Sequence, residues 1–278
     1  MEYKKLGKSD LEISCIGFGC MSLKDNQAEN AKIIHQAIEY GINYFDTADL
    51  YDKGMNEILV GKALQGKREK AVIATKAGNQ WRKDGSGWDW NPRKEYILAA
   101  AEESLKRLQT DYIDLYQLHG GTIDDPIDET IEAFEILQKQ GKIRYYGISS
   151  IRPNVINEYV RRSNIVSVMM QYSLLDRRPE ETCLPLLQQH NIGVLARGSV
   201  ASGLLVNKPA KQYLNYNENQ VQKAATAIKN LSGKHRSAAQ TAIQFVLQKC
   251  YYCFSSGWHK NFRAIKWCCR NNVCTKAY

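Results

Sequence analysis

Four side chains in the sequence are of the types that enzymes use to move protons: an acid, a phenol, an amine and an imidazole. They are Asp46, Tyr51, Lys76 and His119, and each ends or follows a short apolar segment. An ordinary tyrosine keeps its proton until about pH 10, and a nearby ammonium group favours the phenolate. A lysine beside the tyrosine therefore suggests acid–base catalysis, with the carboxylate holding the lysine.

Each of these side chains also has an ordinary structural explanation when it is taken singly. A tyrosine at a strand end is commonly packing, and a lysine–aspartate pair is commonly a structural ion pair. A buried histidine is more often hydrogen-bonded in the core than catalytic. The catalytic interpretation therefore requires that all four side chains meet at one place in the fold.

Short apolar strand candidates alternate with amphipathic helix candidates along most of the chain. This alternation predicts a parallel sheet in an α/β protein, and the number of repeats favours a closed (β/α)₈ TIM barrel. An open dinucleotide-binding sheet would carry G-x-G-x-x-G after its first strand, which Gly17–Ser22 does not match. Before the barrel, Tyr3–Leu6 and Leu11–Ser14 predict a β-hairpin that covers its bottom. The predicted strands are Ile16–Phe18, Tyr44–Asp46, Val72–Lys76, Ile113–His119, Arg144–Ser149, Val166–Gln171 and Gly193–Ala196, and the predicted helices are Ala28–Tyr40, Met55–Leu64, Tyr96–Leu108, Ile127–Gln140, Val155–Arg162, Glu180–His190 and Ala238–Gln248.

The predicted fold brings the four side chains together, because the active site of a parallel barrel forms at the carboxyl ends of its strands. The motifs at these ends resemble those of the aldo-keto reductase superfamily. Phe45–Tyr51 resembles the family signature Asp-x₄-Tyr, and Lys76 and His119 stand where the family keeps its other two catalytic residues. Asp111–Tyr116 resembles the fourth strand of the family, and Gly141–Ser149 resembles the fifth.

This resemblance implies an enzyme that reduces a small aldehyde or ketone with NADP(H) as the hydride source. Tyr51 would donate a proton to the carbonyl oxygen, and Lys76, held by Asp46, would favour loss of that proton. His119 would donate a hydrogen bond to the same oxygen as negative charge develops on it.

The resemblance also assigns residues to the cofactor. Ser149, Ser150 and Gln171 would bind the nicotinamide carboxamide, and small residues after the seventh strand would let backbone N–H groups approach the pyrophosphate. Many relatives carry an aromatic side chain where Arg197 stands, and a planar guanidinium can stack in a similar way; a surface arginine is the alternative. The expected cofactor-binding residues are Gly19, Cys20, Met21, Asp46, Ser149, Ser150, Gln171, Arg197, Gly198, Ser199, Val200, Gly203 and Leu204.

Three tryptophans, Trp81, Trp88 and Trp90, lie in a loop after the third strand that overhangs the mouth in this fold. We interpret them as an apolar wall for the substrate, with packing of an exposed loop as the alternative. A second polar stretch, Lys208–Asn219, is predicted to be a surface loop.

The composition argues against several other classes of protein. The formal net charge is +9, but six of the Lys and Arg residues and no Asp or Glu fall in residues 249–278, so the rest of the chain is nearly balanced. This distribution argues against nucleic-acid binding. The sequence has no apolar run long enough to cross a membrane, and Met1–Lys5 does not start a secretory signal. We therefore expect a cytoplasmic protein, either a monomer or a weak oligomer.

The resemblance stops after residue 248. Relatives continue with an eighth strand, an arginine segment that grips the adenosine 2′-phosphate, and terminal helices. Here residues 249–278 are basic and rich in Cys and Trp. We therefore divide the chain into a barrel, 1–248, and a divergent tail, 249–278. An incomplete or non-native eighth strand would leave the edges of the first and seventh strands unpaired, unless Tyr251–Ser255 pairs with them.

We interpret the tail as the product of a frameshift. Suitable codons for Lys249–Trp267, read one base later, spell a peptide that contains the missing strand and phosphate motif. The gene's nucleotide sequence tests this hypothesis, which fails if no single-base shift restores the motif. Loss of the phosphate segment predicts weaker NADPH binding and lower stability. No metal site is expected in the tail, because Cys268 and Cys269 are adjacent and adjacent cysteines rarely supply two ligands to one tetrahedral ion.

Three other functions remain open at this stage. The first is a nucleotide-binding barrel without catalysis, which slow cofactor turnover would reveal. The second is a different barrel enzyme, such as an aldolase in which Lys76 forms a Schiff base that borohydride would trap. The third is an inactive, truncated reductase.

Overall fold

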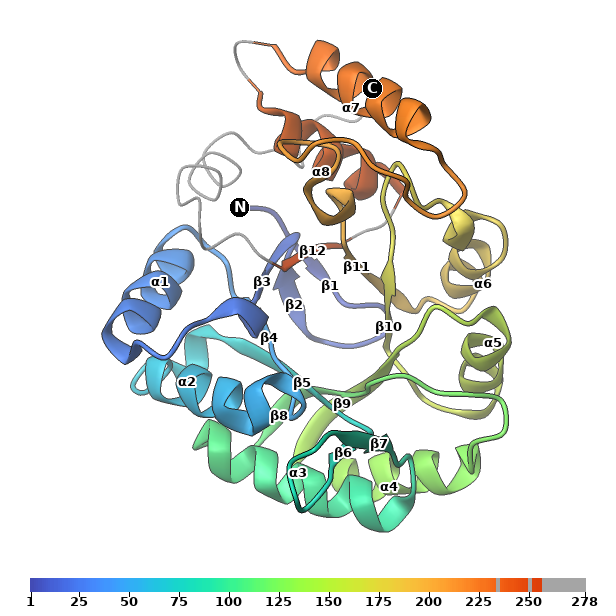
Figure 1. The fold of residues 1–278 in the computed structure, drawn as a ribbon. Coiled ribbons are helices and arrows are strands. Elements are labelled where there is room, and N and C mark those ends of the chain that lie inside the picture. The colour runs from blue at the N-terminus through green and yellow to red at the C-terminus, as the bar shows by residue number, and fades with distance from the viewer. Residues whose placement is uncertain (234–235, 250–251, 257–278) are drawn as a thin grey trace.

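The fold is a closed barrel of eight parallel strands surrounded by helices (Figure 1). The computed structural model describes residues 1–233, 236–249 and 252–256. The strand order around the barrel is β10-β11-β12-β3-β4-β5-β8-β9, so the (β/α)₈ prediction is confirmed. The barrel strands are β3 (Ile16–Gly19), β4 (Tyr44–Asp46), β5 (Val72–Ala77), β8 (Ile113–Leu118), β9 (Ile143–Ser149), β10 (Ser167–Gln171), β11 (Gly193–Arg197) and β12 (Tyr252–Ser256).

The eighth strand closes the barrel through backbone pairing. In β12, Tyr252 lies opposite Leu195 of β11, and Cys253–Ser256 lie opposite Ile16–Gly19 of β3. The first and seventh strands therefore have no unpaired edge, and the alternative in which Tyr251–Ser255 pairs with both agrees with the structure to within one residue. The rest of the predicted tail, with Cys268 and Cys269, lies outside the described residues.

An N-terminal hairpin covers the bottom of the barrel, as predicted. It consists of β1 (Tyr3–Lys5) and β2 (Glu12–Ser14), and Leu6, Leu11 and Ile13 pack against side chains inside the barrel. The turn residue Gly7 has a φ of +55°, and a Cβ added there would lie 2.4 Å from the carbonyl oxygen of Val166. Only glycine fits this close approach of the hairpin to the start of a barrel strand.

A saturated ionic network holds the same end of the barrel. Asp114, near the start of β8, is buried, and its carboxylate accepts hydrogen bonds from Arg68 at 2.6 Å and Arg144 at 3.0 Å. The backbone N–H of Ile73 donates a third bond at 2.9 Å. A buried carboxylate with this many partners is stabilising only while all of them stay in place.

The helices lie outside the barrel and mostly match the predicted segments. The exception is α7, which was not predicted from the sequence and which begins inside the predicted loop Lys208–Asn219. A capping box between Asn217 and Gln220 starts α7, and α7 packs with α8 over the loop after β11. The helices are α1 (Gln27–Glu39), α2 (Met55–Ala63), α3 (Lys94–Leu108), α4 (Ile127–Lys139), α5 (Pro153–Arg162), α6 (Cys183–Gln189), α7 (Glu218–Leu231) and α8 (Ala238–Lys249), with 3₁₀ turns η1 (Cys20–Ser22), η2 (Tyr51–Gly54), η3 (Arg68–Lys70), η4 (Arg178–Glu180) and η5 (Ala201–Gly203).

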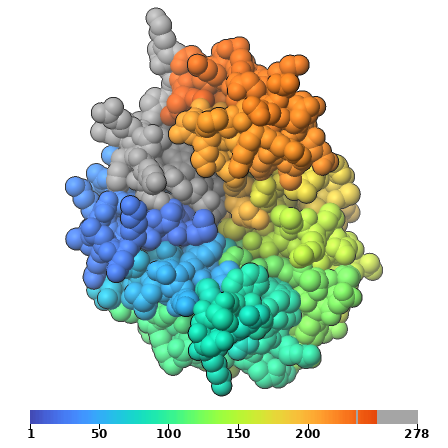
Figure 2. All heavy atoms as spheres, viewed as in Figure 1, coloured from blue at the N-terminus to red at the C-terminus, as the bar shows by residue number. Residues whose placement is uncertain are grey.

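The tryptophan-rich loop forms a second small hairpin. Its strands are β6 (Asn79–Trp81) and β7 (Trp88–Trp90), which pair antiparallel. In the space-filling view the teal atoms of this hairpin lie on the face turned toward the viewer (Figure 2). Because β6 follows the end of β5, the hairpin stands at the carboxyl end of the barrel, beside the predicted site.

Candidate active site

The structure brings the four predicted catalytic side chains together at the carboxyl end of the barrel. Asp46 ends β4, Lys76 lies near the end of β5, His119 directly follows β8 and Tyr51 begins η2. The Lys76 ammonium donates hydrogen bonds to the Asp46 carboxylate and, at 2.7 Å, to the carbonyl oxygen of Thr47. Lys76 Nζ lies 5.1 Å from the centre of the Tyr51 ring, and the Tyr51 and His119 rings meet edge to face with centroids 5.7 Å apart.

The electrostatics of this cluster favour a charged lysine and a neutral histidine. Burial lowers the pKa of Lys76, but the neighbouring Asp46 and Tyr51 outweigh that effect and raise it above its ordinary value. Burial, together with the positive charges of Lys76 and Arg197, lowers the pKa of His119 to about 3. His119 is therefore neutral near pH 7, and within the described chain its buried Nδ1 has no hydrogen-bond partner.

These side chains open into one pocket of about 420 Å³. Tyr51, Lys76 and His119 share its wall, whereas Asp46 is buried behind Lys76 and does not reach it. A volume of this order is typical of a small-molecule site. The lining residues are Met21, Leu50, Tyr51, Lys76, His119, Gly120, Ser149, Ser150, Ile151, Arg152, Met169 and Arg197.

A second layer of polar side chains supports the cluster, and it was not predicted from the sequence. Asp49 is buried, and its Oδ2 accepts a hydrogen bond of 3.1 Å from the hydroxyl of Tyr96, which also lies 3.2 Å from the carbonyl oxygen of Asn79. Burial and the nearby Glu57 raise the pKa of Asp49 to about 7. Asp49 falls inside the signature stretch, but nothing local in the sequence points to a partner on α3.

A second missed residue is Gln117, on β8. Its Nε2 lies 3.4 Å from Oδ2 of Asp46, whereas Lys76 bonds the other carboxylate oxygen, Oδ1. Its own Oε1 is buried and has no partner among the described residues. The alternation of inward and outward side chains along β8 is the one sequence signal that could have placed it.

The predicted cofactor residues lie on the opposite side of the pocket. Ser149, Ser150 and Arg197 line the pocket, and Arg197 is half-buried rather than a free surface arginine. Gln171 lies beside them, where its Oε1 accepts a bond of 3.1 Å from Arg197 and its Nε2 donates one of 2.7 Å to the hydroxyl of Tyr213. The segment predicted to be a surface loop, which contains Tyr213, therefore reaches the site.

The remaining predicted cofactor residues divide between pocket and core. Met21 lines the pocket, but Cys20, which follows the end of β3 at Gly19, is fully buried. After β11 the chain turns tightly, with positive φ angles at Gly198, Ala201, Ser202 and Gly203. In this turn the side chains of Leu204 and Val200 pack into the cluster beneath α7 and α8 and Ser199 is buried, so a ligand could contact the turn through its backbone and the exposed Ser202.

The three tryptophans occupy different environments. Trp90 does not line the pocket itself but packs against Gly120, which does; its indole lies against both Gly78 and Gly120, where an added Cβ would approach the ring to 2.6 Å and 3.0 Å respectively. Its Nε1 donates a 2.9 Å hydrogen bond to Asp125. Trp81, under the Lys53 ammonium, and the exposed Trp88 do not line the pocket. Their role as a substrate wall stays a prediction.

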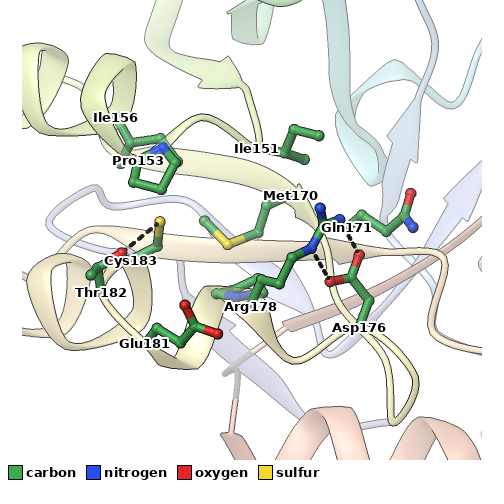
Figure 3. A pocket seen from close by; sticks show the side chains of 11 residues that line it. Ile151, Pro153, Ile156, Met170, Gln171, Asp176, Arg178, Glu181, Thr182 and Cys183 are labelled. Atoms are coloured by element: carbon green, nitrogen blue, oxygen red, sulfur yellow. Dashed lines mark hydrogen bonds and ion pairs between the residues drawn. The ribbon is translucent and has the colours of Figure 1, made fainter. Parts of the chain in front are cut away.

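A smaller cavity of about 220 Å³ lies beside this pocket, between α5, β10 and α6 (Figure 3). Ile151 belongs to both cavities. In the smaller one the Arg178 guanidinium faces Asp176, and donates to both carboxylate oxygens at 2.8 Å. The charge of Arg178 is therefore already neutralised inside the protein.

Within the described residues, no group of His, Cys, Asp and Glu side chains is arranged to hold a metal ion. None of the helices described is long and apolar enough to cross a bilayer.

Comparisons with known proteins agree with this architecture. Residues 15–261 match the model of the aldo/keto reductase family. The chain is 56% identical over 256 residues to the uncharacterized oxidoreductase YqkF of Bacillus subtilis, a match that covers 89% of this chain and 83% of that protein. It is 34% identical to probable aldo-keto reductase 1 of Glycine max, over 88% of this chain and 77% of that one.

Solved structures are similar as well. The holo form of aldo-keto reductase AKR11C1 from Bacillus halodurans has a TM-score of 0.88 and 50% identity, over 96% of this chain and 90% of that one. The glycerol dehydrogenase AKR11B4 from Gluconobacter oxydans has a TM-score of 0.80 and 26% identity, over 91% of this chain and 86% of that one. The chain therefore belongs to the aldo/keto reductase family of oxidoreductases.

Proposed function

We propose that this protein is an NADP(H)-dependent reductase of small aldehydes or ketones and that Tyr51 is its proton donor. The observation that carries the proposal is the shared wall of Tyr51, Lys76 and His119 in one pocket, with a buried ammonium beside the phenol ring. The family activity of carbonyl reduction requires such a group at the position where the carbonyl oxygen gains negative charge.

The three side chains have complementary roles in this proposal. Lys76 cannot move away from the phenol, because Asp46 and the carbonyl oxygen of Thr47 hold its ammonium group. Its charge stabilises the phenolate that remains after Tyr51 gives up a proton. His119, neutral near pH 7, orients the carbonyl oxygen through a hydrogen bond and does not compete as an acid.

The residues on the other side of the pocket fit a nicotinamide dinucleotide. Ser149, Ser150 and Gln171 carry hydroxyl and amide groups suited to a carboxamide, and Arg197 has a planar guanidinium at the same wall. The turn from Gly198 to Leu204 supplies backbone groups for phosphate oxygens. When bound, the cofactor would supply the hydride. The preference for NADP(H), the cytoplasmic location and the monomeric or weakly oligomeric state remain predictions.

The ionic state of Lys76 argues against the aldolase alternative. A Schiff base forms from a neutral amine, which enzymes obtain by lowering the pKa of the lysine. Here Asp46 and Tyr51 raise the pKa of Lys76, so its amine is protonated near pH 7. We therefore favour reduction over Schiff-base chemistry at this site.

The test compares wild type with Tyr51→Phe in NADPH oxidation over a panel of aldehydes. We expect kcat/KM to fall by about 10²–10⁴-fold, the range typical for loss of a general acid, with NADPH affinity unchanged by fluorescence titration. Tyr112→Phe, at a half-buried tyrosine that precedes β8 at the opposite end of the barrel, is the matched control and should keep wild-type rates. Equal rates in wild type and Tyr51→Phe would rule out Tyr51 as the proton donor.

A further inference from the structure

The pocket carries positive charge that the protein does not neutralise. Lys76, Arg152 and Arg197 line it, and its described lining contains no Asp or Glu. Asp46 neutralises Lys76 from behind. Arg197 donates to the neutral amide of Gln171, and Arg152 donates to the carbonyl oxygen of Gly121 at 2.5 Å. In the part of the chain that the structure describes, neither arginine forms an ion pair.

The neighbouring cavity contains an arginine that is paired with a carboxylate, for comparison with the two unpaired ones. There Arg178 lies in a fork against Asp176, whose side chain is buried (Figure 3). Arg107 is paired with the buried Glu57 and Arg68 with the buried Asp114, each through one N–H bond to the carboxylate. Arg152 and Arg197 stand apart from these, because a carbonyl or amide oxygen leaves most of the guanidinium charge uncompensated.

The two unpaired arginines belong to different sides of the pocket. Arg197 ends β11 and bonds Gln171, on the side that we assign to the cofactor. Arg152 follows β9 and stands at the N-cap position of α5. Its bond to Gly121 ties it to the loop that begins at His119, on the side where the carbonyl oxygen would be held. Arg152 is therefore the unpaired cation available to a substrate rather than to the cofactor.

Apolar side chains complete the description of what the pocket would accept. Met21 and Ile151 both line it and are 53% and 51% exposed, so their apolar side chains are accessible from the pocket. They offer a contact for the hydrocarbon part of a ligand. The volume of about 420 Å³ must serve substrate and nicotinamide together, so the substrate is small.

We propose, as an extension of the reductase function above, that the physiological substrate is a small aldehyde or ketone with a carboxylate group, and that Arg152 binds this carboxylate. The planar fork of a guanidinium matches the two oxygens of a carboxylate, and both hydrogen bonds are charge-assisted. The hydrocarbon between carbonyl and carboxylate lies against Met21 and Ile151.

The test uses two aldehydes of nearly the same shape that differ in charge, terephthalaldehydic acid and its methyl ester. We expect wild type to reduce the acid with a kcat/KM about tenfold higher than the ester, mainly through KM. If the ion pair between Arg152 and the substrate carboxylate were fully exposed, the ratio of acid to ester would be smaller than tenfold, and if the pair were fully buried, the ratio would be larger. Raising the salt concentration to about 0.5 M should shrink the ratio, because the pair is accessible to solvent.

Two variants decide whether Arg152 is the cause. In Arg152→Gln the ratio of acid to ester should fall to about one, and Arg152→Lys should keep part of it, because a lysine retains the charge without the fork. Arg161→Gln removes the same charge from an exposed position on the same helix, α5, and should keep the wild-type ratio. A wild-type ratio near one, or an unchanged ratio in Arg152→Gln, would overturn the proposal. If neither aldehyde is reduced with NADPH, the reductase function itself has failed.

Discussion

The two ends of the barrel each contain a buried carboxylate, and the two carboxylates differ in how completely the polar atoms around them are hydrogen-bonded. At the bottom, Asp114 receives hydrogen bonds from Arg68, Arg144 and a backbone N–H. At the mouth, Asp46 faces Lys76 and Gln117, and around it the buried atoms Nδ1 of His119, Oε1 of Gln117 and Oδ1 of Asp49 lack partners within the described chain. The bottom network is complete, whereas the mouth keeps unused hydrogen-bonding capacity.

This difference separates stability from activity along the barrel axis. A buried polar atom without a partner costs about 1–3 kcal/mol, so this region contributes less to stability than a saturated network would. Of these three residues only His119 lines the pocket, where its ring can contact a ligand. We therefore expect substitutions at the bottom to change the free energy of unfolding alone, and substitutions at the mouth to change catalysis.

The largest effect is expected for Lys76→Met, which leaves the buried carboxylate of Asp46 without its ion-pair partner. Breaking a buried pair from one side typically costs about 3–5 kcal/mol. The loss of the ammonium beside Tyr51 should also lower kcat/KM by about 10³-fold. Urea unfolding and steady-state kinetics measure the two effects. A variant with nearly normal kcat/KM would contradict the assignment of Lys76 to the site.

Asp114→Asn tests the other end of the barrel. The amide cannot pair with both Arg68 and Arg144, so the free energy of unfolding should fall by about 3–5 kcal/mol. The kcat/KM per folded molecule should stay within about twofold of wild type. The control is Asp10→Asn, whose ion pair with Arg144 is exposed and should contribute less than about 1 kcal/mol. A large loss of kcat/KM in Asp114→Asn would break the separation between the two ends.

Asp49→Asn should sharpen the comparison through its dependence on pH. The pKa of Asp49 is raised from 3.8 to about 7 in the folded protein, so the folded chain keeps this proton where the unfolded chain has lost it. The stability that Asp49 contributes therefore falls as the pH rises from about 4 to about 7. The Asp49→Asn protein, which is neutral at this position, should be about 2–4 kcal/mol more stable than wild type at pH 8 and nearly equal at pH 4.

Thermal unfolding of both proteins across this pH range provides the measurement. The replacement Asp10→Asn, at an exposed carboxylate, should show no comparable crossover. If the gain of Asp49→Asn were the same at pH 4 and pH 8, ionisation of Asp49 would not be its cause.

The smallest effect is expected directly after Tyr51, where Asp52 and Lys53 both adopt left-handed backbone angles with φ near 50°. Glycine adopts this region without a steric penalty, so Asp52→Gly should stabilise the protein by up to about 1 kcal/mol. Lys32→Gly, at an exposed position in the interior of helix α1, should destabilise it by about the same amount. Calorimetry on the two variants distinguishes the signs. A loss of stability in Asp52→Gly would show that other contacts, rather than strain, dominate at this position.

The sequence allows the barrel and the four side chains of the site to be predicted, because both follow from local patterns. Apolar runs mark the strands, and Asp46, Lys76 and His119 stand at strand ends, where a parallel barrel gathers its loops. The closing strand was only partly predictable, since β12 is defined by its backbone pairing with β3 and β11. β-Propensity indicates a strand near Tyr251–Ser255, but it does not determine the exact bounds of that strand.

The supporting contacts could not be predicted, because each joins residues that are distant in sequence. Tyr96 reaches Asp49 from α3, and Tyr213 reaches Gln171 from a polar stretch that looks like an unconstrained loop. The role proposed for Arg152 could not be predicted for a different reason. It rests on the absence of a carboxylate partner in the described chain, and a sequence does not show which charges remain unpaired.

The indole of Trp90 lies against Gly78 and Gly120, and this arrangement limits how the pocket can be redesigned. A Cβ at Gly78 would collide with the ring, and both glycines have positive φ angles, +128° and +156°, at which any other residue is strained even if the ring is made smaller. The two glycines are therefore expected to tolerate no replacement, whereas position 90 can change in size. A library meant to enlarge the substrate range should keep both glycines and vary position 90.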